Sequence, residues 1–202
     1  MAEFLFRRWS SDFAGDKVEF APILSPQYLY TRERIHDGTP LTEDAGSYGR
    51  TACQVMQKFG VCPEPDFPYV AGQISTLPTP EQDSEAATMK LGAYHRVHIV
   101  DDMKHCIASD YVFIVGFAVR ESFETKTGGT GLYAPKQSEE TLGGHEVTFI
   151  GYDDKAHGGA FLVRNSWGSK WANGGNFWFS YAAAADPSIL HDAFVQHFGK
   201  PW

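Results

Sequence analysis

The chain has few cysteines, fewer basic than acidic residues, and no long apolar run. Its 202 residues include 3 cysteines, and 17 Lys and Arg against 25 Asp and Glu. An odd, sparse set of cysteines argues against a disulfide framework and favours free thiols in a reducing compartment. The formal net charge of -8 argues against nucleic-acid binding, which depends on clustered basic side chains. No apolar stretch reaches the roughly 18 residues of a membrane span. We therefore expect neither nucleic-acid binding nor a membrane-spanning segment.

Two further absences bear on metal chemistry and location. Cys53, Cys62 and Cys106 form no Cys-x-x-Cys pair, and none lies near a histidine at metal-ligand spacing. This pattern predicts no structural metal. The N-terminal residues 1–8 lack the charged start, apolar core and small-residue cleavage site of a signal peptide. Together with the acidic composition, this predicts a cytoplasmic protein.

The first part of the chain is expected to be helical. Apolar residues recur at helical spacing over residues 2–12 and 47–59, and Ser25-Pro26 is typical of a helix start that Asp37-Gly38 would end. Prolines then punctuate residues 62–80, which favours an extended connection between two lobes.

The second part is expected to be rich in strands. Alternating or continuous apolar patterns predict strands at 94–100, 111–119, 143–152, 160–164 and 176–180, with a short helix at 101–109. The glycine-rich residues 125–144 are predicted to form a surface loop near a functional site. Helices followed by antiparallel strands predict an α+β fold, with a helical lobe at 1–80 and a β-rich lobe at 81–202.

Two short segments bear on function. His145 follows Gly143-Gly144 at the start of one predicted strand, and Asn165 is followed by Ser-Trp-Gly at the end of another. An imidazole base and an amide that orients it are what a thiol hydrolase needs to activate its nucleophile. Taken singly, each residue has a simpler interpretation without a catalytic role. Most histidines beside strands only pack in the core or face solvent, and most Asn-Ser pairs lie in turns.

The order of several segments resembles the papain-like cysteine peptidases, in their small bacterial or phage-type form. The matching stretches are Leu24-Ser-Pro-Gln-Tyr-Leu29, Phe59-Gly-Val-Cys-Pro-Glu64 with Phe67-Pro-Tyr69, Gly144-His-Glu-Val147 with Gly151-Tyr152, Arg164-Asn-Ser-Trp-Gly168 with Trp171, and Gly174-Gly175 with Phe177. The Asn-Ser-Trp-Gly signature is the most specific of these.

The resemblance implies a two-lobe fold, with a helical lobe followed by an antiparallel, β-barrel-like lobe that carries His145 and Asn165. It implies peptide-bond hydrolysis by a Cys/His/Asn mechanism on peptide or protein substrates, without metal or organic cofactor. His145 would be the base, Asn165 would orient it, and Trp167 would cover their hydrogen bond. The pair Gly143-Gly144 would let a substrate backbone approach. The oligomeric state stays open.

The nucleophile has no match in this sequence. In the family the histidine follows the catalytic cysteine by about 130–150 residues, which places that cysteine between roughly residue 15 and positions before Met1. No cysteine occurs before Cys53. Cys53, Cys62 and Cys106 lie elsewhere in the pattern and are expected to be buried, non-catalytic thiols.

Three explanations follow for the missing cysteine. The chain is a shortened form of a complete peptidase, a degenerate papain fold that binds peptides or acts as a scaffold without cleaving, or a partner of a separate chain that supplies the cysteine. We favour the first, because His145, Asn165 and Trp167 occur together. On its own, the chain is expected to be inactive.

Overall fold

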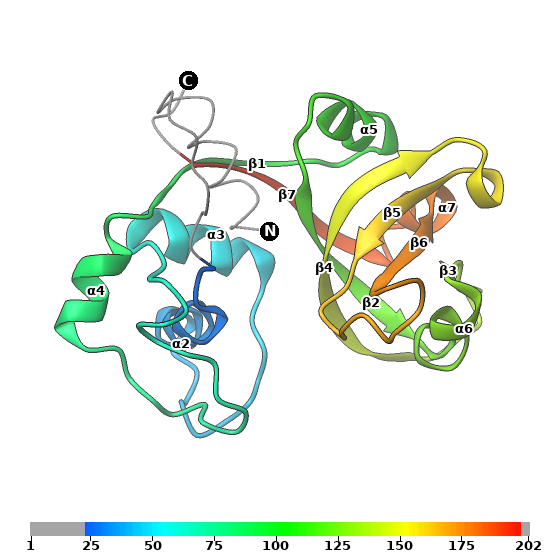
Figure 1. The fold of residues 1–202 in the computed structure, drawn as a ribbon. Helices are drawn as coiled ribbons and strands as arrows, with labels where there is room; N and C mark the ends of the chain where they lie inside the picture. Colours follow the sequence, from blue (N-terminus) through cyan, green and yellow to red (C-terminus); the bar gives the residue numbers. More distant parts are fainter. Residues whose placement is uncertain (1–22, 199–202) are drawn as a thin grey trace. The chain divides into compact units, whose positions relative to one another are not determined.

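A computed structural model of the chain describes residues 23–198 (Figure 1). The helix predicted over residues 2–12 lies outside this range. The described residues form two compact units, one comprising residues 23–95 together with 196–198, and the other Arg96–Val195. Each unit is described by itself. The lobe boundary predicted after residue 80 stays a prediction.

Helices dominate the first unit: α2 (Pro26–Asp37), α3 (Gly49–Lys58) and α4 (Pro80–Ala86). Helix α2 begins where the sequence predicts, because the Ser25 hydroxyl accepts a hydrogen bond from the Tyr28 amide at 2.9 Å and Pro26 occupies the first turn. It ends at Gly38, whose φ of 72° is left-handed.

A buried arginine on α2 orders the loop that follows the helix. Arg34 is fully buried, and its guanidinium donates to the Leu41 carbonyl at 3.1 Å and the Glu43 carbonyl at 3.0 Å. The guanidinium also lies 4.4 Å from the centre of the Tyr30 ring. These contacts satisfy a charge that would otherwise be costly to bury.

The end of α3 requires glycine. The helix is two residues shorter at its start than predicted, and Gly60 follows its C-terminal turn with φ 83°. A Cβ atom built on Gly60 would lie 1.8 Å from the Ala86 carbonyl oxygen, so α4 approaches the backbone here as closely as glycine permits.

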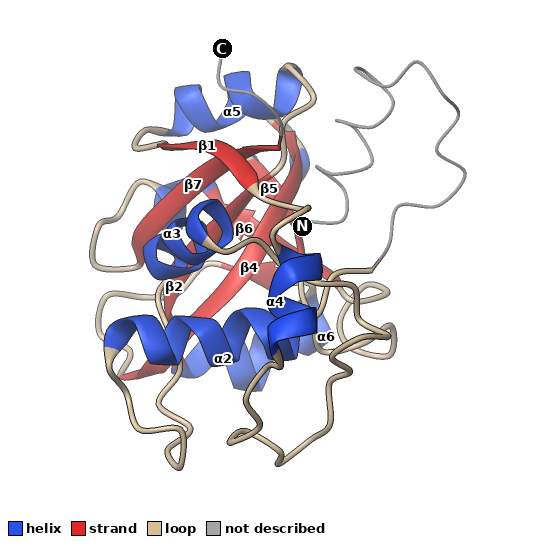
Figure 2. Cartoon of the chain, turned by 90° about the vertical axis from the view of Figure 1, so that its left-hand side faces the viewer, coloured by secondary structure: helices blue, strands red, loops and turns tan. Residues whose placement is uncertain are grey.

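The strands form one open sheet, in the order β1-β7-β2-β4-β5-β6-β3. The strands are β1 (Leu91–Arg96), β2 (Phe113–Arg120), β3 (Leu132–Tyr133), β4 (Thr141–Asp153), β5 (Ala160–Arg164), β6 (Asn176–Ser180) and β7 (Leu190–Phe198). The boundary between the two compact units falls within β1 and β7. Figure 2 shows the strands in red, with α5 (Val100–Ala108) beside them.

The α+β class is confirmed, but parts of the second unit differ from expectation. The sheet is open rather than closed into a barrel, and its edge strand β3 pairs with β6 in parallel. The predicted loop at 125–144 is wrong. It contains most of the π-helix η1 (Phe123–Thr127), the short α6 (Gly128–Thr130), β3 and the start of β4.

The sequence patterns also missed two elements near the C-terminus, α7 (Tyr181–Ala184) and β7, and the short 3-10 helix η2 (Ala156–Gly158). Strand β7 pairs with β2 on the side opposite to β4. Strand β2 therefore lies inside the sheet, and buried residues on both of its faces account for its near-continuous apolar sequence.

The core of the second unit is mainly aromatic and aliphatic. Its fully buried rings are Phe113, Phe117, Phe123, Tyr133, Phe149, Phe161, Phe177 and Phe179. They come from five strands and from η1. No helix within residues 23–198 is long and apolar enough to cross a membrane.

Candidate active site

His145 lies on β4, directly opposite Phe117 of β2. Successive strand residues point to opposite faces, so His145 shares a face with the buried Val147 and Phe149. The imidazole is half-buried and lies at the edge of the aromatic core, 5.9 Å from the Phe117 ring centre. The core therefore fixes one side of the ring while the other side keeps contact with solvent.

Asn165 is the first residue after β5. Strands β4 and β5 are antiparallel with Thr148 opposite Arg164, so the residues just after β5 lie beside the His145 end of β4. The backbone N–H of Asn165 donates to the Gly175 carbonyl at 2.9 Å, which extends the pairing of β5 with β6 by one residue. Two neighbouring pairs of strands thus position the side chain, which is 5% exposed.

The two side chains predicted to act together are hydrogen-bonded. The distance from His145 Nε2 to Asn165 Oδ1 is 2.8 Å. Asn165 Oδ1 also accepts from the Ser166 amide at 2.8 Å, which fixes the orientation of the side-chain amide. A carbonyl oxygen can only accept, so Nε2 carries the hydrogen and Nδ1 keeps its lone pair in the neutral ring.

The other end of the Asn165 amide is unusual. Its Nδ2 is buried and has no hydrogen-bond partner among residues 23–198. A buried donor without an acceptor costs about 1–3 kcal/mol. The side chain is therefore placed to serve His145 and the Ser166 amide at some expense in stability.

Trp167 packs against the imidazole. Their ring centres are 5.3 Å apart with 35° between the planes, and Trp167 is 43% exposed. The indole therefore contacts the imidazole and is itself partly open to solvent. The turn that carries Trp167 includes Gly168, whose φ is 84°.

The sequence did not single out Phe123, which supports this arrangement. Its fully buried ring lies 6.1 Å from His145, 5.2 Å from Trp167 and 5.6 Å from Trp171, centre to centre. Phe123 begins the π-helix η1, beside the segment expected to be a loop. Nothing in the local pattern distinguishes it, whereas Trp171 stands in the signature after Asn165.

Gly143 and Gly144 are exposed residues of β4 that precede His145. Neither has a positive φ, so no turn requires them. The positions where their Cβ atoms would lie have no neighbour closer than 4.0 Å within the described chain. The strand therefore presents bare backbone beside the imidazole.

Glu146 follows His145 on the opposite face of β4. It lies opposite Gly116 of β2, and Asp192 of β7 lies opposite Gly116 from the other side. Desolvation and the negative charge of Asp192 raise the pKa of Glu146 to about 7, although the side chain keeps contact with solvent.

The three cysteines do not have the surroundings of a nucleophile. Cys53 and Cys62 are buried, and Cys106 is partly buried. Burial, with nearby carboxylates, raises the pKa of Cys62 to about 11 and raises the pKa of Cys106 above its usual range. Catalytic thiols need the opposite shift. Within residues 23–198 no group of three His, Cys, Asp or Glu side chains could hold a metal ion.

Comparison with known sequences identifies relatives of this chain. Residues 24–196 match the profile of the papain family of cysteine proteases. An uncharacterized peptidase C1-like protein of Acanthamoeba polyphaga mimivirus is 32% identical over 181 residues, 83% of this chain and 57% of that protein. A probable cysteine protease of Arabidopsis thaliana is 26% identical over 125 residues, 61% of this chain and 26% of that protein. The chain thus matches less than two thirds of either relative.

Solved structures give the same result for the fold. Xylellain, a cysteine protease from Xylella fastidiosa, superposes with a TM-score of 0.82 at 28% identity, over 97% of this chain and 76% of that one. The bromelain protease from Ananas comosus superposes with a TM-score of 0.64 at 18% identity, over 97% of this chain and 84% of that one, and supports the fold alone. The chain belongs to the papain family of cysteine proteases.

Proposed function

We propose that this chain carries the base and the orienting amide of a papain-type site that hydrolyses peptide bonds in peptides or proteins. The observation that carries the proposal is the hydrogen bond of 2.8 Å between His145 Nε2 and Asn165 Oδ1. It leaves Nδ1 as the free base of the neutral imidazole. Membership of the papain family supports a cysteine as the attacking group.

The proposed reaction follows from this tautomer. His145 Nδ1 takes the proton of a cysteine thiol, and the thiolate attacks the carbonyl carbon of the scissile peptide bond. The C–N bond breaks as the imidazolium returns the proton to the leaving amine, which leaves a thioester. Water, deprotonated by His145, then cleaves the thioester and regenerates the thiol. No metal or organic cofactor takes part in the proposed steps.

Asn165 and Trp167 would act through the imidazole. Asn165 keeps the ring in the orientation and tautomer that present Nδ1, and Trp167 shields that hydrogen bond from water. The bare backbone of Gly143 and Gly144 leaves room for an extended substrate segment beside the base.

None of Cys53, Cys62 and Cys106 is proposed as the nucleophile. Cys53 is buried, and the raised pKa values of Cys62 and Cys106 hold those two thiols in the protonated form. The proposal therefore predicts that residues 1–202 alone are inactive. An activated cysteine would have to come from further sequence of the same protein or from another chain.

The test uses the complete open reading frame that contains residues 1–202, and residues 1–202 alone. A biotinylated E-64-type epoxide should label the complete product at a cysteine other than these three. Labelling should fall at least tenfold in the His145→Ala variant and should also fall in Asn165→Ala. Asn173→Ala, the same change in the exposed turn before β6, is the matched control for Asn165→Ala and should leave labelling unchanged.

Two results would contradict the proposal. Rapid labelling of Cys53, Cys62 or Cys106 in residues 1–202 would assign the nucleophile to this chain. Unchanged labelling of the complete product after His145→Ala would remove the histidine from the reaction. If no reactive cysteine is encoded, the non-catalytic alternative of a peptide-binding or scaffold protein gains support, and calorimetry with peptide pools tests it.

A further inference from the structure

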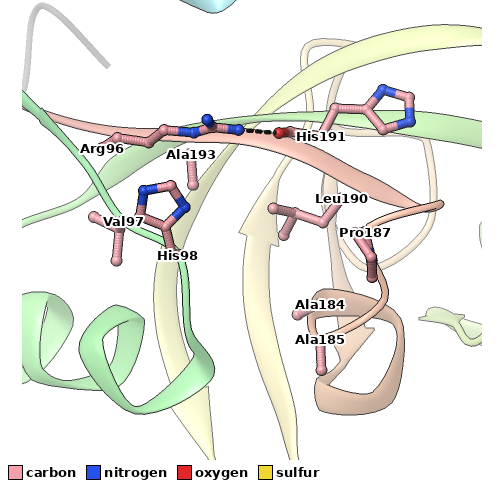
Figure 3. A pocket seen from close by; sticks show the side chains of 9 residues that line it. All are labelled: Arg96, Val97, His98, Ala184, Ala185, Pro187, Leu190, His191 and Ala193. Atoms are coloured by element: carbon pink, nitrogen blue, oxygen red, sulfur yellow. Dashed lines mark hydrogen bonds between the residues drawn. The ribbon is translucent and has the colours of Figure 1, made fainter.

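A pocket in the second compact unit lies outside the proposed catalytic site. It has a volume of about 380 Å³ and is formed by three segments: the end of β1 with the residues after it, the end of α7 with the turn that follows, and β7. Its lining residues are Arg96, Val97, His98, Ala184, Ala185, Pro187, Leu190, His191 and Ala193 (Figure 3). This volume lies at the lower end of the range for small-molecule sites.

The apolar walls of the pocket are preformed. Val97, Ala184, Leu190 and Ala193 are each at most 9% exposed and belong to the main hydrophobic core of the unit. Figure 3 shows Leu190 pointing into the space between His98 and the end of α7. An alkyl chain would meet the small accessible parts of Val97 and Leu190 and the exposed Ala185, and would order few side chains on binding.

The polar lining residues of the pocket are Arg96, His98 and His191. Arg96 lies along β7, where its Nη2 donates to the His191 carbonyl at 2.8 Å (Figure 3). The same nitrogen pairs with Asp192 at 2.9 Å. Both contacts use Nη2, so the guanidinium is oriented while Nη1 and Nε have no hydrogen-bond partner within residues 23–198. His98 is exposed and lines the same pocket as Arg96.

None of the lining residues is acidic. A guanidinium is a strong donor to carboxylates and can hold a second acceptor through its remaining N–H groups. The imidazole of His98 can add another hydrogen bond. With Asp192 paired to Nη2, the remaining N–H groups of Arg96 and the absence of an acidic lining residue favour an acceptor oxygen such as a carboxylate over a cation. The apolar lining residues favour a short hydrocarbon chain attached to it.

We propose that this pocket binds a small alkyl carboxylate, with the carboxylate at Arg96 and His98 and the alkyl chain between Val97, Leu190 and Ala185. Binding should be weak, with a Kd on the order of 1 mM. Asp192 already offsets the charge of Arg96, and the chain as a whole carries a formal charge of -8. The proposal does not depend on the hydrolytic function.

The test is an NMR titration of the complete chain with hexanoate, and with hexanamide as a neutral control of the same shape. Hexanoate should shift the backbone signals of Val97, Leu190 and Ala193 in a saturable way, and hexanamide should bind at least fivefold more weakly. The Arg96→Gln and His98→Gln variants should each weaken hexanoate binding at least threefold. His95→Gln, the same change outside the lining, should leave it unchanged.

A further variant separates the pocket from other surfaces. Ala185 is exposed, so Ala185→Trp should fold and fill the space, and hexanoate binding should fall at least fivefold. Equal affinity for hexanoate and hexanamide, binding unaffected by Ala185→Trp, or no saturable shift at these residues would each overturn the proposal. The comparison of the two ligands on the unaltered protein decides the question even if a variant fails to fold.

Two further titrations use a peptide with a free C-terminus and the same peptide with an amidated C-terminus. They distinguish a free acid from the carboxylate of a peptide end as the source of the group. Tighter binding of the free peptide than of hexanoate assigns the pocket to peptide ends, whereas tighter hexanoate binding assigns it to small acids.

Discussion

Replacing Asn165 by alanine tests the central feature of the site, because stability and imidazole orientation should respond differently. Alanine removes the two hydrogen bonds that Oδ1 accepts, from His145 and from the Ser166 amide, each at 2.8 Å. At about 0.5–1.5 kcal/mol each, their loss should cost about 1–3 kcal/mol.

The same substitution also removes a penalty. Asn165 Nδ2 is buried without a partner among residues 23–198, and such a donor costs about 1–3 kcal/mol. The two effects oppose each other and are similar in size. The free energy of unfolding of Asn165→Ala should therefore change by less than about 2 kcal/mol, despite a side chain that is 5% exposed.

The imidazole should change more clearly. Without the Asn165 oxygen, the preference for a hydrogen on Nε2 loses about 1 kcal/mol, which is roughly a fivefold change in the tautomer ratio. Nitrogen NMR of His145 measures that ratio, and urea unfolding measures stability. The exposed control Asn173→Ala should alter neither.

Either of two outcomes would refute this reasoning. A loss of more than about 3 kcal/mol would mean that the Asn165 amide is fully satisfied and supports the fold. An unaltered tautomer ratio at His145 would mean that the hydrogen bond does not orient the ring.

Three other predictions concern the surroundings of the site and the first unit. Phe123→Ala should destabilise the protein by about 3–5 kcal/mol, because removal of its fully buried ring leaves a cavity. Calorimetry and near-UV circular dichroism measure the effect, and a change below about 1 kcal/mol would contradict the prediction. Gly60→Ala should lower the free energy of unfolding by at least about 2 kcal/mol, because the φ is 83° and the new Cβ would clash with the Ala86 carbonyl. Gly38 also has a positive φ but has open space around it, so Gly38→Ala should lower the free energy of unfolding by less. Denaturant unfolding measures both. Cys62, with its pKa raised to about 11, should react with iodoacetamide far more slowly at pH 7 than a free thiol, and the reaction should become faster as the pH rises toward that pKa. Mass spectrometry measures the rate of modification. Fast reaction at pH 7 in the folded protein would contradict a buried, protonated thiol.

Several elements could be predicted from local sequence because local chemistry decides them. The Ser25-Pro26 start and Gly38 end of α2, and the strands β5 and β6, lie where capping residues and apolar periodicity place them. The motifs around His145 and Asn165 are sufficient to identify the family, because their order and the Trp-Gly that follows are specific.

The C-terminal elements and the segment before β4 could not be predicted in this way. Strand β7 has no clear alternation over Leu190–Phe198, and its pairing with β2 is a long-range contact. Phe123 lies among polar residues and glycines, yet it is fully buried because rings from distant strands surround it. Burial of that kind is a property of packing and leaves no periodic signal.

The sequence by itself determined the family and the two residues most specific to it, since these depend on residue types in a fixed order. Only the tertiary structure decided that His145 Nε2 and Asn165 Oδ1 lie 2.8 Å apart, because the register of β4 with β5 brings the residue that follows β5 beside His145 of β4. It also decided which thiols are buried and which aromatic rings hold the imidazole. Those properties depend on how the strands and their connections pack.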